Sequence, residues 1–378
     1  MNFEEHVAKP LLREAGIAVP AGGVAETVAA ARDLAAAIGP VVVKAQVPTG
    51  KRGKAGGIKV AGTPDEAAAA AADILGMEIA GHRVARVLVE ARVDIAQELY
   101  AAVLNDTVGG CPLVMFSAKG GMDIEDLAAA DPGAIRRHMV DIAEGFGTAQ
   151  AEALIADATP TGATRAIAET LAALYALYRA RDAELLEINP LAVTGDGAVI
   201  ALDCKLVLDD SALVRQADLA DRGAPEPATA LERRGQDHGL RYIELDGDVG
   251  ILANGAGLTM TTMDAVTHFG GRPANFLEIG GEAYTKAVPA LGLVLANPRV
   301  KSLVVNFCGA FARCDVMTGG VVEAWETLKP EIPVFFSIHG TGEDEAIAMV
   351  RARLGLEPFD VMDEAVKAAI RAARGERA

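Results

Sequence analysis

Apolar positions in the first half of the chain recur at two spacings, one typical of helices and one typical of strands. Helical spacing comes first, at Phe3, Val7, Leu11 and Leu12, and Gly16 ends this helix. Short apolar runs between glycines, prolines or charged residues then predict strands, and alanine-rich stretches predict helices. We expect strands at 40–47, 57–62, 86–93, 97–106 and directly after Cys111, and helices at 27–39, after Gly62 and through most of 130–180.

A hairpin and a change of composition follow. Residues 184–193 and 197–208 are apolar runs around a Gly-Asp-Gly turn at 195–197, which predicts two antiparallel strands. Residues 209–240 are polar and hold few large apolar side chains, so we interpret them as a partly helical connecting arm.

From Tyr242 onward, strand patterns alternate regularly with helix patterns. This alternation predicts βαβ units and a parallel sheet. Four successive predicted strands end in glycine-containing loops, at Gly255, Gly280–Gly281, Gly309 and Gly340. Ligands of such sheets bind at the carboxyl ends of the strands, so these loops indicate a binding edge.

One of these loops raises a specific question about anion binding. In VNFCGAFARCD (305–315), a buried-looking strand reaches Gly309, and a helix is expected to begin near Arg313 or Asp315. A strand, a glycine and a helix N-terminus often form an anion site, because the first helical N–H groups are free. The loop has a single glycine, so the pattern leaves open whether it holds a phosphate, a carboxylate or no ligand.

Composition and charge narrow the class of protein. The 378 residues carry a formal net charge of −17, which argues against a nucleic-acid-binding face. The four cysteines form no C-x-x-C pair and have no histidine at ligand spacing, so we expect no zinc site. The amphipathic N-terminus does not resemble a signal peptide, and no apolar run is long enough to cross a membrane. We therefore expect a cytoplasmic protein with reduced thiols.

The first candidate for chemistry is a basic loop after an apolar strand. Lys44 ends the run VVVK, and TGKRGKAGG follows with Lys51, Arg52, Gly53 and Lys54. A strand lysine under a glycine-rich loop is a common arrangement around nucleotide phosphates, although the Walker A spacing is absent. The alternative is a solvated basic turn.

Two further groups contain carboxylates. Glu90 ends one predicted strand and Glu98 begins the next, where they could accept hydrogen bonds from a base or a ribose, or simply be surface carboxylates. Glu187 and Asn189 share one face of a strand because side chains alternate, and Asp203 is expected nearby on the partner strand. Carboxylate and amide oxygens suit Mg²⁺, and the alternative is a polar cross-strand pair.

These motifs, in order, resemble the β subunit of succinate–CoA ligase, with malate–CoA ligase as a close relative. The resemblance rests on GKRGKAGGIKV, VEARVDIAQELY, LEINPLAV, ALDCKL, NGAGLTMTTMD and NFCGAFARCD, and it covers nearly the whole chain. It implies an α/β protein, with an ATP-grasp domain followed by a flavodoxin-like parallel-sheet domain. The implied bounds are 1–225 with an inserted subdomain at about 21–95, a linker at 226–241, and 242–378.

The resemblance also implies roles for individual residues. Glu187 matches a glutamate that assists phosphoryl transfer with a histidine, and Asn189 and Asp203 match Mg²⁺ ligands. The positions that match nucleotide contacts are Lys44, Lys51, Arg52, Gly53, Glu90, Val93 and Glu98. The positions that match substrate contacts are Asn254, Gly309, Ala310, Phe311 and Ala312.

A partner is implied as well. In the family, the phosphorylated histidine and most of the CoA site belong to the α subunit, and none of the six histidines here lies in a glycine- or alanine-rich loop. We therefore expect an ADP-forming acid–CoA ligase that is active only with an α subunit, as an αβ or α₂β₂ assembly. ATP is the expected nucleotide, and GTP remains open. The N-terminus of the helix after Gly309 is expected to face the phosphohistidine.

The chain departs from the family at the substrate loops. The family's GGGA is GGEA here, with Glu282, and the family's GGI-type loop reads Gly309–Ala310–Phe311. Ser337 replaces an arginine, and His339 appears two residues later. We hypothesise a carboxylic acid other than succinate as the substrate, although these positions could also lie beside the substrate without touching it. A citryl-CoA-forming ligase and a non-catalytic ATP-grasp binder are the alternatives.

Overall fold

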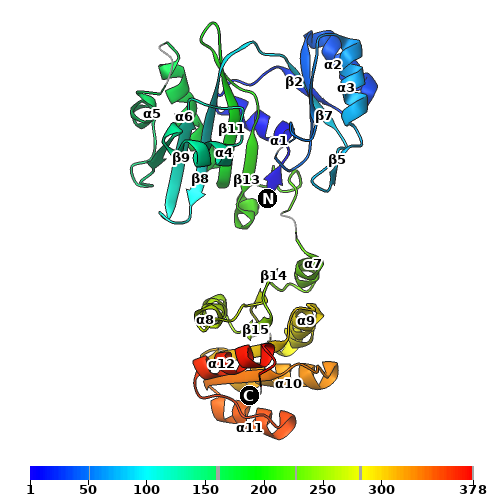
Figure 1. The fold of residues 1–378 in the computed structure, drawn as a ribbon, viewed down its shortest axis with the longest axis vertical. Helices are drawn as coiled ribbons and strands as arrows, with labels where there is room; N and C mark the ends of the chain where they lie inside the picture. Colours follow the sequence, from blue (N-terminus) through cyan, green and yellow to red (C-terminus); the bar gives the residue numbers. More distant parts are fainter. Residues whose placement is uncertain (51, 159–161, 226–227, 281–282, 377–378) are drawn as a thin grey trace. The chain divides into compact units, whose positions relative to one another are not determined.

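The fold is described by a computed structural model that covers residues 1–50, 52–158, 162–225, 228–280 and 283–376. The chain divides into two compact units, Met1–Glu226 and Pro227–Ala378 (Figure 1). Each unit has hydrophobic cores of its own. Among the helices of these described ranges, none combines the length and the apolar content needed to cross a lipid bilayer.

The first unit is built on a seven-stranded antiparallel sheet. The strand order is β1-β13-β11-β8-β9-β10, and β12 pairs with β11. The strands are β1 (Asn2–Phe3), β8 (Ile95–Asp106), β9 (Cys111–Ser117), β10 (Ile135–Met139), β11 (Ala183–Thr194), β12 (Val199–Ala201) and β13 (Lys205–Leu208). The helices α1 (Glu5–Glu14), α5 (Thr148–Ile155) and α6 (Thr164–Ala180) contribute to the core beneath this sheet. The predicted hairpin is confirmed, because β11 pairs with both β12 and β13.

A smaller antiparallel sheet belongs to the same unit. Its order is β2-β7-β3-β4, formed by β2 (Gly22–Ala25), β3 (Val41–Ala45), β4 (Ile58–Ala61) and β7 (Val87–Ala91). The helices α2 (Val28–Ile38) and α3 (Pro64–Ile74) cover one face of it (Figure 1). Thr27 and Thr63 cap these helices through their side chains, as expected for threonine at an N-cap. The range predicted as an inserted subdomain contains all of these elements.

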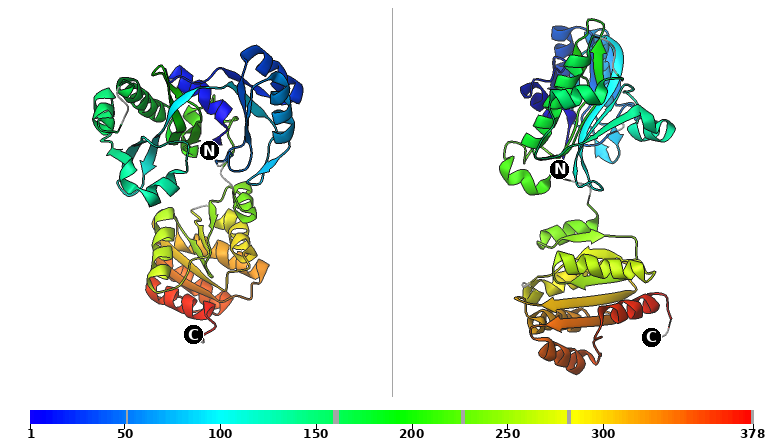
Figure 2. Two further views of the ribbon diagram at one scale, coloured as in Figure 1. Left: turned by 45° about the horizontal axis from the view of Figure 1, so that its top comes forward. Right: turned by 90° about the vertical axis from the view of Figure 1, so that its left-hand side faces the viewer.

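Shorter elements complete the first unit. They are the hairpin of β5 (Glu78–Ile79) and β6 (His82–Arg83), the helix α4 (Ile124–Ala130), and the 3₁₀ turns η1 (Pro132–Ala134) and η2 (Asp210–Arg215). Helix α1 lies between the two sheets (Figures 1 and 2). Its side chains contact β3, β7 and the segment before β13.

The prediction of helix through most of 130–180 is only partly right. Helices α5 and α6 lie there, but β10 is a strand paired antiparallel with β9. The sequence IRRHM has no strong preference against a strand, and β9 offers an open edge of backbone N–H and C=O groups. Pairing with that edge outweighs the helical preference of the surrounding alanines.

The second unit is built on a parallel sheet, as predicted from the alternation. The order is β15-β17-β18, with β15 (Val249–Ala253), β17 (Ser302–Gly309) and β18 (Val334–Gly340). Parallel bridges join Pro273 and Glu278, on either side of β16 (Asn275–Leu277), to Val249 and Ala253 of β15. Strand β14 (Tyr242–Glu244) pairs antiparallel with β16. The expected last strand is reduced to a bridge between Ser337 and Phe359.

Helices cover both faces of this sheet (Figure 2). One face packs against α8 (Ala256–His268) and α12 (Met362–Ala373). The other packs against α9 (Ala283–Ala296), α10 (Cys314–Leu328) and α11 (Glu343–Leu354). A further helix, α7 (Ala230–Asp237), lies within the range predicted as a linker, and the Glu244 backbone N–H donates to Glu232 of α7 at 2.9 Å.

Candidate functional site

A cavity of about 480 Å³ opens in the first unit between the large sheet and the small sheet. The small sheet contributes Lys44 and Glu90, the basic loop contributes Arg52, and the hairpin of the large sheet contributes Glu187 and Asp203. The predicted residues that line the cavity are Lys44, Arg52, Gly53, Glu90, Val93, Glu187, Asn189 and Asp203. Most of the predicted nucleotide and metal positions, which come from segments far apart in the sequence, thus line the same cavity.

Two predicted nucleotide-binding positions, Glu98 and Lys51, are not among the described residues that line the cavity. Glu98 is exposed on β8, and its backbone carbonyl accepts from the Gly120 N–H at 2.9 Å. Lys51 lies outside the described residues.

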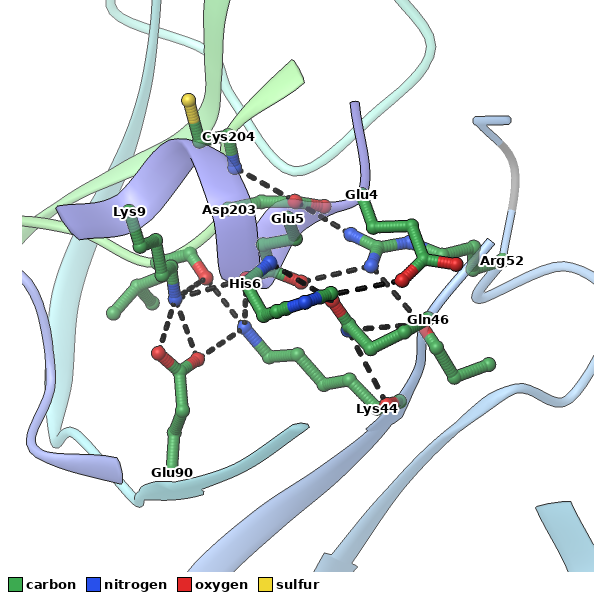
Figure 3. Close-up of polar contacts among 12 residues, drawn as sticks. Glu4, Glu5, His6, Lys9, Lys44, Gln46, Arg52, Glu90, Asp203 and Cys204 are labelled. Carbon is green, nitrogen blue, oxygen red and sulfur yellow. Dashed lines mark hydrogen bonds and ion pairs between the residues drawn. The ribbon is translucent and has the colours of Figure 1, made fainter. Parts of the chain in front are cut away.

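The centre of one cavity wall is a cluster of buried charges around Glu5 (Figure 3). The Glu5 carboxylate forms ion pairs with Lys9 Nζ at 2.8 Å and Lys44 Nζ at 2.9 Å through Oε1, and with Arg52 Nη1 at 2.8 Å through Oε2. Lys44 Nζ also donates to Glu90 Oε2 at 2.8 Å. With Asp203, which pairs with Arg52, three carboxylates face three cations, and such pairing is what the burial of charge requires.

Electrostatics around Glu5 follow from this arrangement. Burial by itself would raise the pKa of Glu5, but Lys44, Lys9 and Arg52 outweigh it and hold that pKa well below its usual range. Burial would likewise lower the pKa of Lys44, whereas Glu5 and Glu90 raise it above the ordinary lysine value. Both groups are therefore charged at neutral pH.

Arg52 links the basic loop to the hairpin of the large sheet. Its Nη2 donates to Asp203 Oδ1 at 2.6 Å, and its Nη1 donates to the Ala45 carbonyl at 3.1 Å. The next cation of the loop, Lys54, pairs with Asp123 at 3.3 Å, at the start of α4. The loop therefore contacts both sides of the cavity.

Glu187 lies beside Tyr100, whose hydroxyl donates to Glu187 Oε2 at 3.1 Å. Burial raises the pKa of Glu187, and this effect exceeds the opposing effects of Lys205 and of the Tyr100 hydrogen bond. Burial and the neighbouring Glu187 also raise the pKa of Tyr100, so its hydroxyl stays a donor at neutral pH. A carboxyl with a raised pKa facing a cavity is suited to proton exchange or to orienting a cationic group.

Asn189 and Asp203 fit the donor chemistry of Mg²⁺. Asn189 Oδ1 accepts from the Gly121 N–H at 2.8 Å, its Nδ2 donates to the Met122 carbonyl at 2.8 Å, and Asp203 Oδ1 accepts from Cys204 N at 2.7 Å. Both side chains line the cavity. The described part of the chain contains no group of three His, Cys, Asp or Glu side chains arranged for a metal. An amide and a single carboxylate match an ion that completes its shell with phosphate oxygens and water.

The predicted substrate positions lie in the second unit, at the carboxyl end of its parallel sheet. Asn254 follows β15, and its side chain donates to the Cys308 carbonyl at 2.9 Å and accepts from the Cys308 N–H at 2.7 Å. Gly309 is buried at the end of β17, Ala310 is exposed, Ala312 is half-buried, and the Phe311 ring is fully exposed. Asn254 therefore holds the loop that presents Phe311.

At the N-terminus of α10, one of the N–H groups that were expected to be free has a partner within the chain. The Cys314 N–H donates to the Thr341 carbonyl at 2.8 Å, and Asp315 places a carboxylate in the first turn. Arg313 donates two hydrogen bonds to Asp315, each 2.9 Å long, and these bonds lower the pKa of Asp315. The chain thus supplies its own anion and its own cation at this helix end.

The residues that depart from the family pattern, Ser337, His339 and Glu282, differ in how exposed they are or in whether the structure describes them. Ser337 is fully buried within β18, so it presents no group at the surface of this edge. His339 is more exposed and pairs with Glu343 at 3.5 Å. Glu282 lies outside the described residues.

Sequence reasoning missed Glu5, Lys9, Tyr100 and the pairing of Lys54 with Asp123. A signal for the first two was present, because positions 5, 8, 9 and 12 share one face of α1, and a charged pair there interrupts an apolar stripe. No local pattern marks Tyr100, since its role depends on β8 lying beside β11.

Both halves of the chain match known protein families. The model of the ATP-grasp domain family matches residues 2–193, and that of the CoA-ligase family matches residues 252–371. The chain is 44% identical over 355 residues to the succinate–CoA ligase [GDP-forming] subunit beta of Thermus thermophilus, covering 93% of this chain and 94% of that protein. It is 42% identical over 379 residues to the succinate–CoA ligase [ADP-forming] subunit beta of Rubrobacter xylanophilus, covering 99% of both.

Among solved structures, the fold is similar to that of ATP citrate lyase from Methanothrix soehngenii in complex with citrate and coenzyme A. The TM-score is 0.65 at 23% sequence identity, and the match covers 98% of this chain and 99% of that one. At this level of identity the likeness concerns the fold alone.

Proposed function

The chain belongs to the succinate–CoA ligase β-subunit family, and from this premise we propose that it is the nucleotide- and acid-binding subunit of an ADP-forming acid–CoA ligase. The single observation that carries the proposal is the shared cavity of Lys44, Arg52, Glu187, Asn189 and Asp203. Phosphoryl transfer needs cations at the phosphates and a group that orients the acceptor, and this cavity contains both.

The proposed reaction has three steps. A histidine of a partner α subunit attacks the terminal phosphorus of ATP, and the bond to the ADP oxygen breaks. The phosphoryl group then passes from the histidine to the carboxylate of the acid, which forms an acyl phosphate and frees the histidine. The CoA thiol attacks the acyl carbon, and phosphate leaves as the thioester forms.

Roles follow from the contacts in the cavity. Lys44 and Arg52 would bind phosphate oxygens, because they are the cations of the buried cluster that line the cavity. Mg²⁺, held by Asn189, Asp203 and phosphate oxygens, would neutralise charge on the nucleotide. Glu187 would accept a hydrogen bond from the ring N–H of the α-subunit histidine, and Tyr100 fixes the Glu187 carboxylate for this contact.

The acid would bind in the second unit, at the carboxyl end of the parallel sheet, where Asn254 holds the loop of Gly309 to Ala312. The exposed Phe311 ring supplies an apolar wall there, which favours a small carboxylic acid with an apolar portion. Relatives with both ADP-forming and GDP-forming names match the chain, so both nucleotides belong in the assay.

The test is an assay of the chain co-purified with a CoA-ligase α subunit. We expect ADP and acyl-CoA to form only when both subunits, Mg²⁺, CoA and an acid are present. A panel of succinate, malate, citrate and monocarboxylic acids identifies the substrate by kcat/KM, and parallel reactions with GTP define the nucleotide. Absence of Mg·ATP binding to the chain in calorimetry would refute the proposal and favour a non-catalytic role.

A further inference from the structure

Two lysine ammonium groups beside the cavity share the same three acceptor oxygens (Figure 3). Lys44 Nζ contacts Glu5 Oε1 at 2.9 Å, Glu90 Oε2 at 2.8 Å and the backbone oxygen of Leu202. Lys9 Nζ contacts Glu5 Oε1 at 2.8 Å, both oxygens of Glu90, and the Leu202 oxygen at 2.9 Å. An ammonium group has three N–H donors, so Lys44 has a partner for each of its donors in this arrangement.

The two lysines differ in what they can reach. Lys44, at the end of β3, lines the cavity. Lys9, on α1, is 4% exposed and is not among the described residues that line the cavity. A ligand in the cavity can therefore contact the Lys44 ammonium, whereas the Lys9 ammonium stays behind the carboxylates.

This difference matters when Lys44 takes a new partner. To donate to a phosphate, Lys44 must release at least one of its three present acceptors. Glu5 and Glu90 are 2% and 3% exposed, and a buried carboxylate that loses its cation is strongly destabilised. Lys9 already contacts both carboxylates and the Leu202 oxygen, so these acceptors keep a cation when Lys44 leaves.

We propose that Lys9 is a positioning residue that neutralises Glu5 and Glu90, so that Lys44 can turn from them to a phosphate of the bound nucleotide. The inference rests on the nucleotide-binding function proposed above. Lys9 itself touches no ligand and acts through Lys44. A purely structural role, in which Lys9 only ties α1 to β7, predicts a loss of stability without a specific link to Lys44.

The test compares K9M, K44M and the double variant K9M/K44M by calorimetry with Mg·ATP, using the full chain. In K9M, Lys44 is the one cation left for Glu90 in the described part of the chain, whereas Glu5 also keeps Arg52, so Glu90 opposes the release of Lys44. We expect Mg·ATP affinity to fall about tenfold in K9M, a size typical of coupling between contacting charged groups. It should fall at least as far in K44M, and no further in the double variant, because Lys9 acts only through Lys44.

Two additional variants separate positioning from folding. K9R keeps a cation beside Glu5 and Glu90 and should restore affinity to within about threefold of the wild type. The neutral exchange E90Q/K9M, measured against E90Q as its reference, removes the carboxylate whose cations are Lys9 and Lys44, while Glu5 keeps Arg52 when Lys44 turns away. The K9M change should therefore cost less than about threefold in affinity in the E90Q background, whereas a structural role predicts the same loss there as in the wild-type background. K59M removes an exposed ion pair with Asp73 in the same subdomain and is the matched control.

The possible outcomes distinguish the failure of this inference from the failure of the proposed function. Wild-type affinity in K9M, or independent losses that multiply in K9M/K44M, would overturn the inference while leaving the proposed function intact. If K9M does not fold, the comparison of E90Q/K9M with E90Q carries the test, and a loss of about tenfold or more between these two variants overturns the inference. Failure of the wild-type chain to bind Mg·ATP, or wild-type binding by K44M, would overturn the proposed function and this inference with it.

Discussion

At the residue scale, two carboxyl groups that line the cavity, those of Glu5 and Glu187, have different neighbours, and their pKa values are shifted in opposite directions. Glu5 is surrounded by three cations, and its pKa lies well below the usual range despite its burial. Glu187 has a tyrosine hydroxyl and a more distant lysine as neighbours, and burial raises its pKa. Glu5 is thus held as a carboxylate, whereas burial favours the neutral form of Glu187.

Replacement of Glu187 by glutamine should remove catalysis while leaving nucleotide binding intact. The amide keeps the shape of the side chain but cannot orient and stabilise a histidine that gains positive charge. We expect kcat to fall by about 10²- to 10⁴-fold and the dissociation constant of Mg·ATP to change by less than about threefold. Steady-state kinetics and calorimetry measure the two quantities. Glu184→Gln, exposed on the same strand, is the control and should retain activity.

The same residue gives a pH dependence with a defined sign. The ionised form of Glu187 is the active one in the proposed role, so activity should fall as the pH drops through its pKa. Because burial raises that pKa, the acidic limb of kcat/KM should lie above the range of an ordinary glutamate. The hydrogen bond from Tyr100 lowers the pKa, so Tyr100→Phe should move the limb to still higher pH. A limb that moves to lower pH in this variant would contradict the assignment.

At the scale of elements, α1 connects the two sheets of the first unit through both apolar packing and ion pairs. Its apolar residues Val7, Leu11 and Leu12 pack into the large-sheet core, while Glu5 and Lys9 reach the small sheet. Glu5 also occupies the first turn of the helix, where the helix dipole favours a negative charge. The position of Lys44 relative to the hairpin therefore depends on this helix.

Removal of the Glu5 carboxylate should destabilise the first unit markedly. Glu5→Ala leaves buried cations with too few partners, and we expect the free energy of unfolding to fall by about 3 kcal/mol at pH 7. Urea denaturation measures this change. Glu14→Ala, exposed at the other end of α1, should cost less than about 1 kcal/mol.

The stability of the wild-type chain should also depend on Glu5 in acid. A carboxyl whose pKa is lowered by folding stabilises the folded state fully above its unfolded pKa, about 4.3, and loses this contribution as the pH falls toward the folded value. The fall in stability below that pH should be less steep in E5A than in the wild type. Equal slopes would mean that other carboxyls account for the acid sensitivity.

At the scale of the whole molecule, the two units have different types of sheet, and each contains one of the two groups of predicted site residues. The antiparallel sheets of the first unit surround the cavity, and the parallel sheet of the second unit presents the loop of Phe311. Each unit has separate hydrophobic cores. All described residues that line the cavity belong to the first unit.

Separation of the units should therefore divide the functions. A fragment of residues 1–226 is expected to fold and to bind Mg·ATP with an affinity within about threefold of that of the full chain, because its core and cavity are complete. The fragment of residues 227–378 should not bind the nucleotide, and neither fragment alone should support ligase activity. Calorimetry on each fragment tests this prediction. A first fragment that folds without binding Mg·ATP would show that the second unit contributes to the site.

The sequence by itself determined most of the elements and their order, with β10 and the expected last strand as exceptions. Periodicity and glycine positions are local properties, so the parallel alternation after Tyr242, the hairpin at 184–208 and the start of α10 were all predicted correctly. The match of Lys44, Glu187, Asn189 and Asp203 to family motifs also marked residues that the fold then gathers around one cavity.

Only the tertiary structure decided which partners these residues meet. The strand β10 forms because β9 offers an open edge, and Lys44 faces Glu5 because α1 lies between two sheets that are distant in the sequence. The pairings of Arg52 with Asp203 and of Tyr100 with Glu187 likewise join residues 151 and 87 positions apart. Such contacts depend on how sheets pack and not on local preference, and they set the charges and pKa values on which the chemistry of the site depends.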